Sequence, residues 1–519
     1  MSEITQPPDV PLILSVSGAR GIVGRSMTPA VAADFAAAFG SFVKEATGKS
    51  DPVLCVGRDS RPSGQMLASA AVAGLTAVGA RVIDLGVVTT PTVAVMIGHH
   101  RADGGMVITA SHNPIIWNGL KCLGADGGAP PKRDVDEIIR RFRQREIDYA
   151  AVEDLHPSKR DKTSHETHVA RVLAHIDSAS IRAGQFKVVL DSVNGAGCAV
   201  GRMLLDELGC EVIHLNGEPT GIFAHTPEPI EENLTELAAL TKSSRAVCGF
   251  AQDPDADRLA IVDETGRYIG EEYTLVLAAR RLLDLRAAAG ESGEVVIAAN
   301  LSTSRMIDDL AASYENVKVL RTPVGEANVA EAMKPPAPGS TPGNGPAPGN
   351  GDGEGPGKSA GTTSGGALMG GEGNGGVIFP PVCWVRDSLS AMALVLGLLA
   401  ADPRKKPLSE IVDEMPRYCM IKRKQPLASP DAAAILKKVS GTFSGPDTAK
   451  KVPDTFSGAD TFSGAKIDTS DGVRLDFDDG WVHLRPSNTE PIIRLIAEAQ
   501  TAQRAEALIA EVSSAAGLS

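Results

Sequence analysis

One local pattern recurs through most of this chain and limits the folds open to it. A short apolar run is followed by a polar or glycine-rich turn, and then by a stretch whose apolar residues have helical spacing. Strands that alternate with helices in this way are typical of layered α/β domains. The pattern stops and restarts, which indicates several related α/β domains rather than one large sheet. The runs expected to form strands are 12–16, 52–57, 81–86, 105–108, 187–191, 210–215, 247–251 and 294–299.

The C-terminal part of the chain departs from this pattern. Residues 472–477, 481–484 and 492–498 predict neighbouring strands, and a helical stretch follows them. A sheet with a covering helix, an α+β module, is the expected form. With 519 residues the chain is too long for one hydrophobic core, and a prior of about 150 residues per domain gives three to four domains.

Composition excludes two classes of partner. Hydrophobic residues make up 43% of the sequence and charged residues 22%, which is ordinary for a globular protein. The net charge of −13 leaves no overall basic field to attract nucleic acid or an anionic membrane surface. Phosphate groups would have to be bound by local clusters of basic and hydroxyl side chains.

Three further features predict a cytoplasmic protein. The seven cysteines are scattered and contain no C-x-x-C pair, which favours a reducing compartment. Residues 1–8 lack the basic and apolar regions of a signal peptide. The longest apolar run, 389–401, is too short for a membrane span of about 20 residues and predicts a buried helix.

A hydroxyl, an imidazole and an amide follow directly after the expected strand 105–108. Ser111 and His112 precede Asn113-Pro114, and Asn118-Gly119 follows; both dipeptides favour turns. Loops at the end of a rigid sheet are a common place for catalytic side chains. These residues alone leave two interpretations open, a satisfied turn or a nucleophilic serine.

Two more polar turns are expected in the same unit. Residues 17–21 form a glycine-flanked turn that carries Arg20, and residues 58–64 form a polar loop after the expected strand 52–57. A third turn, 89–92, precedes a helix.

Three carboxylates occupy every second position behind the expected strand 247–251. Asp253, Asp255 and Asp257 can converge on an extended or turning backbone, and hard oxygen ligands suit Mg²⁺. An N-terminal helix cap or a solvated acidic loop is the alternative. The segment is shorter than the 12-residue calcium loop of an EF-hand, which disfavours calcium.

Two other loops carry groups suited to a sugar phosphate. Arg485-Pro-Ser-Asn-Thr, with Arg494 further on, offers guanidinium, hydroxyl and amide groups to a phosphate dianion, although a surface turn is an equal alternative. Residues 371–376 are a glycine-rich loop around Glu372 and Asn374 that could bind sugar hydroxyls. The competing interpretation is a flexible tail of the glycine-rich segment that precedes it.

Two low-complexity stretches are not expected to carry chemistry. Residues 334–366 consist mainly of Pro, Gly, Ser and Asn without apolar periodicity, which predicts a disordered insertion. Residues 440–466 hold Thr-Phe-Ser-Gly three times and predict an irregular loop expansion, since a solenoid needs longer repeats.

The four motifs together resemble one known family. Thr109-Ala-Ser-His-Asn-Pro, Asp253-Pro-Asp-Ala-Asp-Arg, Gly371-Glu-Gly-Asn and Arg485-Pro-Ser-Asn-Thr-Glu-Pro occur in the order seen in the α-D-phosphohexomutases. That family holds phosphoglucomutases, phosphomannomutases and phosphoglucosamine mutases. The resemblance covers nearly the whole chain apart from the two low-complexity stretches.

The resemblance implies three similar α/β domains with mixed sheets and a C-terminal α+β domain around a central cleft. We expect the first domain, 1–170, to carry the phosphoserine loop and the second, 171–268, the magnesium loop. The third, 269–403, would carry the sugar loop and the disordered insert 334–366. The fourth, 404–519, would carry the phosphate loop and the irregular insert 440–466.

The resemblance also implies a role for individual residues. Ser111 matches the phosphorylated serine, and Asp253, Asp255 and Asp257 match the ligands of one Mg²⁺ with an oxygen of the phosphoserine. Arg20 and Lys121 match basic residues near the reacting phosphate, with His112 and Arg258 beside them. The residues expected to hold the sugar and its distal phosphate are Glu372, Asn374, Arg485, Ser487, Asn488, Thr489 and Arg494.

The implied reaction interconverts hexose 6-phosphate and hexose 1-phosphate. Phosphoserine 111 would give its phosphoryl group to the sugar, and the 1,6-bisphosphate formed would turn over in the site before the other phosphate returns to Ser111. Phosphoryl transfer needs mainly alignment and charge neutralisation. Partners would be small hexose phosphates, with a hexose 1,6-bisphosphate as activator and no nucleic acid or membrane. The protein would be a monomer or a homodimer.

The sugar loop favours one substrate. Many family members carry Gly-Glu-x-Ser-Gly-His, whereas Asn374 and Gly376 replace the serine and histidine here, a form that resembles archaeal-type phosphoglucosamine mutases. We therefore expect glucosamine phosphate, with phosphomannomutase/phosphoglucomutase activity as the alternative. A catalytically silent sugar-phosphate-binding relative, or a phosphatase that hydrolyses the phosphoserine, are alternatives of a different class.

Overall fold

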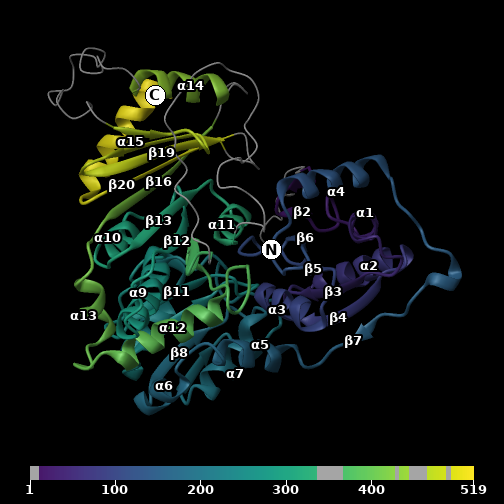
Figure 1. Cartoon of the computed structure of the whole chain (residues 1–519), viewed down its shortest axis with the longest axis horizontal. Helices are drawn as coiled ribbons and strands as arrows, with labels where there is room; N and C mark the ends of the chain where they lie inside the picture. Colours follow the sequence, from purple (N-terminus) through teal and green to yellow (C-terminus); the bar gives the residue numbers. More distant parts are fainter. Residues whose placement is uncertain (1–10, 336–365, 427–431, 444–464, 487–491, 519) are drawn as a thin grey trace, which may run out of the picture.

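The computed structural model describes residues 11–335, 366–426, 432–443, 465–486 and 492–518 (Figure 1). They form four sheets, each with its own helices, so the predicted architecture of three α/β domains and one α+β domain is confirmed. Most of the two predicted inserts lies outside these residues. Of the second insert, 440–443 belong to a helix and 466 begins a strand, so the prediction of an irregular loop was wrong at both ends.

The first domain is built on a seven-stranded mixed sheet in the order β1-β2-β6-β5-β3-β4-β7. The inner strands β4, β3 and β5 are parallel, whereas β5, β6, β2 and β1 pair antiparallel. Its elements are β1 (Ile13–Ser15), β2 (Gly18–Ile22), α1 (Pro29–Thr47), β3 (Val53–Arg58), α2 (Gly64–Ala77), β4 (Arg81–Val87), α3 (Thr90–His100), β5 (Gly104–Ile108), β6 (Trp117–Leu123), α4 (Lys132–Gln144), the 3₁₀ helix η1 (Val152–Asp154) and β7 (Lys159–Arg160).

Two predicted turns of this domain are strands. Arg20 lies in β2 and Asn118-Gly119 in β6, and these two strands pair with each other. The turn itself lies at residues 16–17, and Gly18 directly after it has a φ of 94°. Gly18 and Gly119 also permit the close pairing of the two strands. A Cβ on Gly18 would lie 2.0 Å from the carbonyl oxygen of Leu120, and one on Gly119 would lie 2.5 Å from that of Ala19. The predicted turn 89–92 is likewise the beginning of α3, which Thr89 caps.

The second and third domains repeat a smaller version of this plan. Their sheets have the orders β11-β10-β8-β9 and β13-β12-β14-β15, each with parallel strands and one antiparallel edge strand. The second contains α5 (Ser164–Leu173), α6 (Ser178–Gly184), β8 (Lys187–Asp191), α7 (Gly197–Glu207), β9 (Glu211–Leu215), η2 (Glu231–Asn233), α8 (Thr235–Ser244), β10 (Cys248–Gln252) and β11 (Leu259–Asp263). The third contains α9 (Glu272–Ala288), β12 (Val295–Asn300), α10 (Met306–Ala312), β13 (Val317–Thr322), α11 (Glu326–Met333), β14 (Met369–Glu372), β15 (Gly376–Ile378), α12 (Ser388–Ala401) and α13 (Leu408–Asp413).

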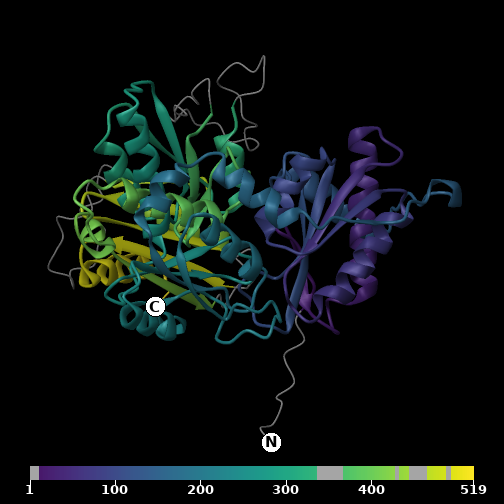
Figure 2. The same ribbon diagram turned by 90° about the horizontal axis from the view of Figure 1, so that it is seen from below.

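The fourth domain is a five-stranded antiparallel sheet in the order β16-β20-β19-β18-β17 with helices α14 and α15. Its elements are β16 (Cys419–Pro426), α14 (Ala432–Phe443), β17 (Lys466–Asp468), β18 (Val473–Phe477), β19 (Gly480–Pro486), β20 (Ile492–Ala499) and α15 (Ala502–Ala516). The first domain lies on one side of the molecule and the other three on the other side in both views (Figures 1 and 2).

The apolar run 389–401 forms the buried helix α12, as predicted. Its residues from Ser388 to Leu399 are all buried, and the helix packs against α9, α6 and α5. Burial on every side explains why this helix is apolar all round without spanning a membrane. Among the described helices, none is long and apolar enough to cross a membrane.

Candidate active site

All four predicted functional loops connect antiparallel neighbouring strands. The Ser111 loop joins β5 to β6, the aspartate loop joins β10 to β11, and the Glu372–Asn374 loop joins β14 to β15. The fourth loop lies between β19 and β20. Each domain therefore contributes one connection between neighbouring antiparallel strands, at a sheet edge in the second and third domains and inside the sheet in the first and fourth.

Arg61 holds the backbone of the Ser111 loop through several hydrogen bonds. Its side chain is fully buried and donates hydrogen bonds to the carbonyl oxygens of Ser111 and Asn113, both at 2.6 Å. It also donates to the carbonyl oxygens of Pro114 and Trp117 and pairs with Asp59. A planar guanidinium suits this task because its donors have fixed directions. The sequence had marked 58–64 only as a polar loop.

Ser111 is held in a backbone conformation that few residues adopt. Its φ of 48° lies in the left-handed region, which is uncommon for a residue other than glycine and clusters at functional sites. Its hydroxyl donates to Oδ2 of Asp253 at 2.9 Å and lies 3.3 Å from Nδ1 of His112. The serine of the first domain therefore touches the aspartate loop of the second.

The three aspartates converge as predicted. Asp253, Asp255 and Asp257 are almost completely buried, and one carboxylate oxygen of each lies within 4.8 Å of the others. Ala256 has a φ of 54°, which bends the loop so that the three side chains meet. Among the described residues, Oδ1 of Asp255 and Oδ1 of Asp257 have no hydrogen-bond donor. Buried carboxylate oxygens without donors fit a divalent cation with oxygen ligands.

The charges of the cluster also fit a cation. Burial, with the neighbouring carboxylates, raises the pKa of Asp253 well above its usual range and that of Asp255 to about 6. Burial also opposes the ionisation of Asp257, but Arg386, Lys121 and Arg258 outweigh it and lower its pKa to about 2. Like charges at this separation repel one another, and a bound divalent ion would remove that repulsion.

The aspartate loop is tied to two other domains. Thr90, at the start of α3, donates from its hydroxyl to Oδ2 of Asp255 at 2.6 Å. Arg386 of the third domain donates to Oδ2 of Asp257, and its other terminal nitrogen donates to Glu372 at 2.7 Å. Outer-shell partners of this kind orient metal-binding carboxylates.

Hydrogen bonds within the protein hold the carboxylate of Glu372 in position. Its Oε1 accepts hydrogen bonds from Asn300 at 2.8 Å and from the backbone of Gly325 at 3.1 Å. The side chain of Asn374 lies 3.4 Å from the other carboxylate oxygen. A rigid carboxylate next to an amide is a suitable pair for sugar hydroxyls.

A cleft of about 700 Å³ is lined by His112 and Arg258, the chain neighbours of Ser111 and Asp257, whereas Ser111 and the three aspartates are not among its lining residues. Residues of all four domains line it, and eight of the predicted site residues or their neighbours are among them. These are Arg20, His112, Asn113, Arg258, Glu372, Asn374, Arg485 and Arg494. Lys422 and Lys424 of β16 also line it, and neither was predicted as a site residue.

The predicted phosphate side of the cleft is described in part. Arg485 ends β19, where its Nε lies 3.1 Å from Oδ2 of Asp471, and it pairs in register with Arg494 of β20. Ser487, Asn488 and Thr489 lie outside the described residues. Two guanidinium groups on adjacent strands remain in place for a dianion.

Lys121 has a partner that the sequence did not reveal. Its Nζ lies 2.7 Å from Oε2 of Glu326, in the third domain, and 4.0 Å from Oδ2 of Asp257. Arg258, which follows the aspartates, lies near the ring of His112, and its charge and then burial lower the pKa of that imidazole well below the usual range.

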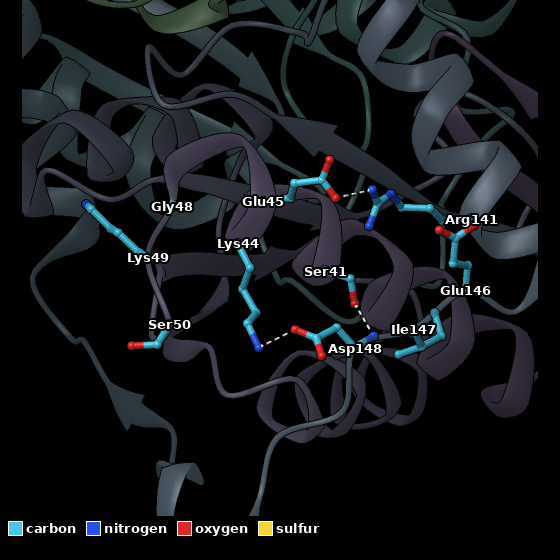
Figure 3. A pocket seen from close by; sticks show the side chains of 10 residues that line it. All are labelled: Ser41, Lys44, Glu45, Gly48, Lys49, Ser50, Arg141, Glu146, Ile147 and Asp148. Atoms are coloured by element: carbon cyan, nitrogen blue, oxygen red, sulfur yellow. Dashed lines mark hydrogen bonds and ion pairs between the residues drawn. The ribbon is translucent and has the colours of Figure 1, made fainter.

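A second hollow of similar volume lies in the first domain, between α1 and the end of α4 (Figure 3). Its charged side chains are paired with one another or with near neighbours: Lys44 with Asp148 at 2.9 Å, and Arg141 with Glu45 at 2.5 Å. It has no convergence of loops from several domains. Predicted site residues line the cleft and not this hollow.

The comparisons with known proteins agree with this geometry. The family models of phosphoglucomutase/phosphomannomutase match domain I at residues 12–148, domain II at 166–266, domain III at 270–346 and 353–418, and the C-terminal domain at 423–515. A Phosphoglucomutase/phosphomannomutase of Thermococcus kodakarensis is 36% identical over 94% of each chain. A protein of Methanopyrus kandleri named "Probable phosphoglucosamine mutase" is 34% identical over 95% of each chain.

Comparison with solved structures shows a similar fold. The structure of a phosphoglucomutase/phosphomannomutase family protein of Burkholderia thailandensis superposes with a TM-score of 0.74, at 24% identity, over 97% of each chain. Matches to all four domain models and relatives above 30% identity over almost the full length establish the relationship that the motifs predicted. The chain belongs to the phosphoglucomutase/phosphomannomutase family.

Proposed function

We propose that this chain is a phosphohexomutase that interconverts hexose 6-phosphate and hexose 1-phosphate, with glucosamine phosphate as its preferred substrate. The observation that carries the proposal is the contact between Ser111 Oγ and Asp253, 2.9 Å, at the meeting of two domains beside the cleft. This contact supports the proposal because a nucleophilic serine is needed beside a group of carboxylates that can hold a metal.

The metal would be Mg²⁺, held by Asp253, Asp255, Asp257 and an oxygen on Ser111. Bound there, it would neutralise the charge that develops on the phosphoryl group. Arg20, His112 and Arg258 face the same region from the cleft and supply further positive charge or hydrogen-bond donors.

Each half-reaction breaks one P–O bond and forms another. In the first, the phosphoryl group leaves Oγ of Ser111 for a sugar hydroxyl, which gives up its proton, and Oγ gains one. His112 Nδ1, 3.3 Å from Oγ, is within reach for holding that proton. In the second half-reaction the other phosphate of the 1,6-bisphosphate returns to Oγ, so the enzyme is regenerated.

The two ends of the sugar phosphate need different contacts. One phosphate must face Ser111 while Arg485, Arg494 and the loop between β19 and β20 hold the other. Glu372 and Asn374 line the same cleft and would bind the sugar hydroxyls. Because the intermediate must turn over, the fourth domain would open and close the cleft.

The preference for glucosamine phosphate rests on the sugar loop and on the relatives. The loop has the Gly-Glu-Gly-Asn-Gly-Gly form, and the relative from Methanopyrus kandleri has a phosphoglucosamine mutase name. The name of the relative from Thermococcus kodakarensis supports the alternative, a phosphoglucomutase/phosphomannomutase.

The test is phosphorus NMR of the protein with Mg²⁺ and a trace of hexose 1,6-bisphosphate as activator. Glucosamine, glucose and mannose 6-phosphates are offered separately, and the appearance of each 1-phosphate is timed. Fastest conversion of glucosamine 6-phosphate supports the proposal, and faster conversion of another sugar supports the alternative. No conversion indicates a silent relative, and release of inorganic phosphate alone indicates a phosphatase.

A further inference from the structure

Lys121 and Glu326 form an ion pair between the first and third domains beside the aspartate loop. Lys121 lies on β6 and Glu326 is the first residue of α11, and Nζ lies 2.7 Å from Oε2. The side chains are 15% and 9% exposed. The other oxygen of Glu326 accepts from the backbone of Arg386 at 2.8 Å, so the carboxylate is fixed at both oxygens.

This pair differs from an ordinary surface pair on the same helix. Glu331 and Lys334 are also 2.8 Å apart, but Glu331 is 64% exposed and such pairs contribute little. A buried pair loses the hydration of both charges, a loss that its mutual attraction often only balances. Stability alone is therefore a weak explanation for placing Lys121 and Glu326 here.

The surroundings of Lys121 suggest another explanation. Oδ2 of Asp257 lies 4.0 Å from Nζ, so Asp257 is a second carboxylate within ion-pair distance of Lys121. If the ammonium of Lys121 contacted Asp257 directly, it would lie among the carboxylate oxygens that are proposed to bind the metal. Glu326, at the shorter distance, holds Lys121 beside Asp257 without such contact.

Arg386 connects the same group to the sugar loop. It donates to Asp257 and to Glu372, and one of its terminal nitrogens lies 3.9 Å from Oε2 of Glu326. The positions of Lys121, Asp257 and Glu372 are therefore fixed by one network of alternating charge. The residues of this network come from the first three domains.

We propose that Glu326 is a positioning residue of the phosphohexomutase reaction, which holds the ammonium of Lys121 beside the aspartate cluster and off Asp257. The role rests on the proposed function, because it assumes that Lys121 serves a reacting phosphate. Two effects follow from removing the carboxylate: Lys121 loses its position, and it moves toward Asp257, where it competes with the metal.

The test is a double-mutant cycle of Glu326→Gln and Lys121→Met, with Glu331→Gln as the matched control on the same helix. Turnover is measured at saturating hexose phosphate, and Mg²⁺ binding is measured separately by calorimetry on each variant. Melting curves establish that each variant is folded. If Glu326→Gln does not fold, Glu326→Asp, which keeps the charge at a shorter reach, replaces it.

We expect Glu326→Gln to lower kcat and weaken Mg²⁺ binding by about 10- to 100-fold, the usual effect of an outer-shell change. In the Lys121→Met background the same substitution should change either quantity by less than about 2-fold, because the coupled partner is absent. Glu331→Gln should leave both at the wild-type value. If Glu326→Asp is used, the same coupling with a smaller loss is expected.

Independent losses that multiply in the double variant, or unchanged Mg²⁺ binding in Glu326→Gln, would overturn the role of Glu326. These results differ from failure of the proposed function. In that case the wild-type protein itself would convert none of the hexose phosphates, and the positioning role would fall with it.

Discussion

Thr90 joins the first domain to the metal loop of the second through its hydroxyl, which donates to Oδ2 of Asp255 over 2.6 Å. The backbone of the same two residues is bonded as well, from the Thr90 N–H to the Asp255 carbonyl oxygen at 3.0 Å. Both residues are buried, so water does not replace the contact when it is lost.

Replacing Thr90 by Val should therefore weaken Mg²⁺ binding, because one oxygen of Asp255 loses its orienting donor. We expect about a 10-fold loss. Valine keeps the shape of threonine but not its hydroxyl, so a melting curve is needed to establish that Thr90→Val is folded. Thr90→Ser keeps the hydroxyl and should bind Mg²⁺ nearly as the wild type does. Titration calorimetry measures both, and equal affinity in Thr90→Val and the wild type would contradict the orienting role.

Removal of Arg61 should destabilise the first domain. Arg61→Met leaves Asp59 buried without its ion-pair partner and removes the hydrogen bonds that Arg61 donates to four carbonyl oxygens, and breaking a buried pair on one side costs about 3–5 kcal/mol. The expected result is a lower melting temperature and a more protease-sensitive Ser111 loop. Adding Asp59→Asn should recover part of the loss. An unchanged melting temperature in Arg61→Met would be inconsistent with this account.

His225 provides a pH dependence outside the cleft. Burial opposes its charge, but a hydrogen bond of 3.1 Å to Asp191 and the carboxylate charge outweigh burial and raise the pKa of His225. A raised folded-state pKa stabilises the protein fully below the unfolded value of about 6.5, and the gain is lost as pH rises through the folded value.

The substitution His225→Gln should accordingly lower the melting temperature more at pH 5.5 than at pH 9. A hydrogen bond to a charged group is worth about 1.5–3 kcal/mol, which sets the upper range of the difference. Melting curves of both proteins at both pH values give the answer. A larger loss at pH 9 would reverse the predicted sign.

The fourth domain should move when substrate binds. Its contacts with the third domain include Ser302 Oγ to His483 Nδ1 at 2.9 Å and Arg305 N to Glu498 at 2.8 Å, hydrogen bonds that a rotation of the fourth domain would have to rearrange. We expect a smaller radius of gyration in X-ray scattering with a bound hexose 1-phosphate than without it. Superimposable scattering curves would count against closure.

Much of this fold could be predicted because its signals are local. Apolar runs separated by turns and helices located eight strands of the three α/β domains to within a residue or two, as for β8 at 187–191 and β10 one residue beyond 247–251. The other strands described in these domains, β2, β6, β7, β11, β13, β14 and β15, were not expected. The glycines of β2 and β6 misled the prediction, because glycine marks both turns and close strand pairing. Only the paired strand tells the two cases apart, and it lies about a hundred residues away.

The residues of the candidate site also fall into two groups, those in short local motifs and those whose partners are distant in the sequence. Ser111 and the three aspartates stand in short motifs whose residue types suit the chemistry, so they were recognised before the fold was known. Arg61, Thr90, Glu326 and Arg386 act on partners 50 or more residues away. A single sequence does not reveal such pairings, although Arg61 did stand in a polar loop behind a strand.

The most direct test of the central claim is transfer of a labelled phosphoryl group through Ser111. Wild type and Ser111→Ala would be incubated with Mg²⁺ and ³²P-labelled hexose 1,6-bisphosphate, desalted, and then mixed with unlabelled glucosamine 6-phosphate. We expect the wild type to hold label on Ser111 and to pass it to sugar phosphate, while folded Ser111→Ala holds none and has no mutase activity. Equal labelling of both proteins, or activity in Ser111→Ala, would show that another residue carries the phosphoryl group.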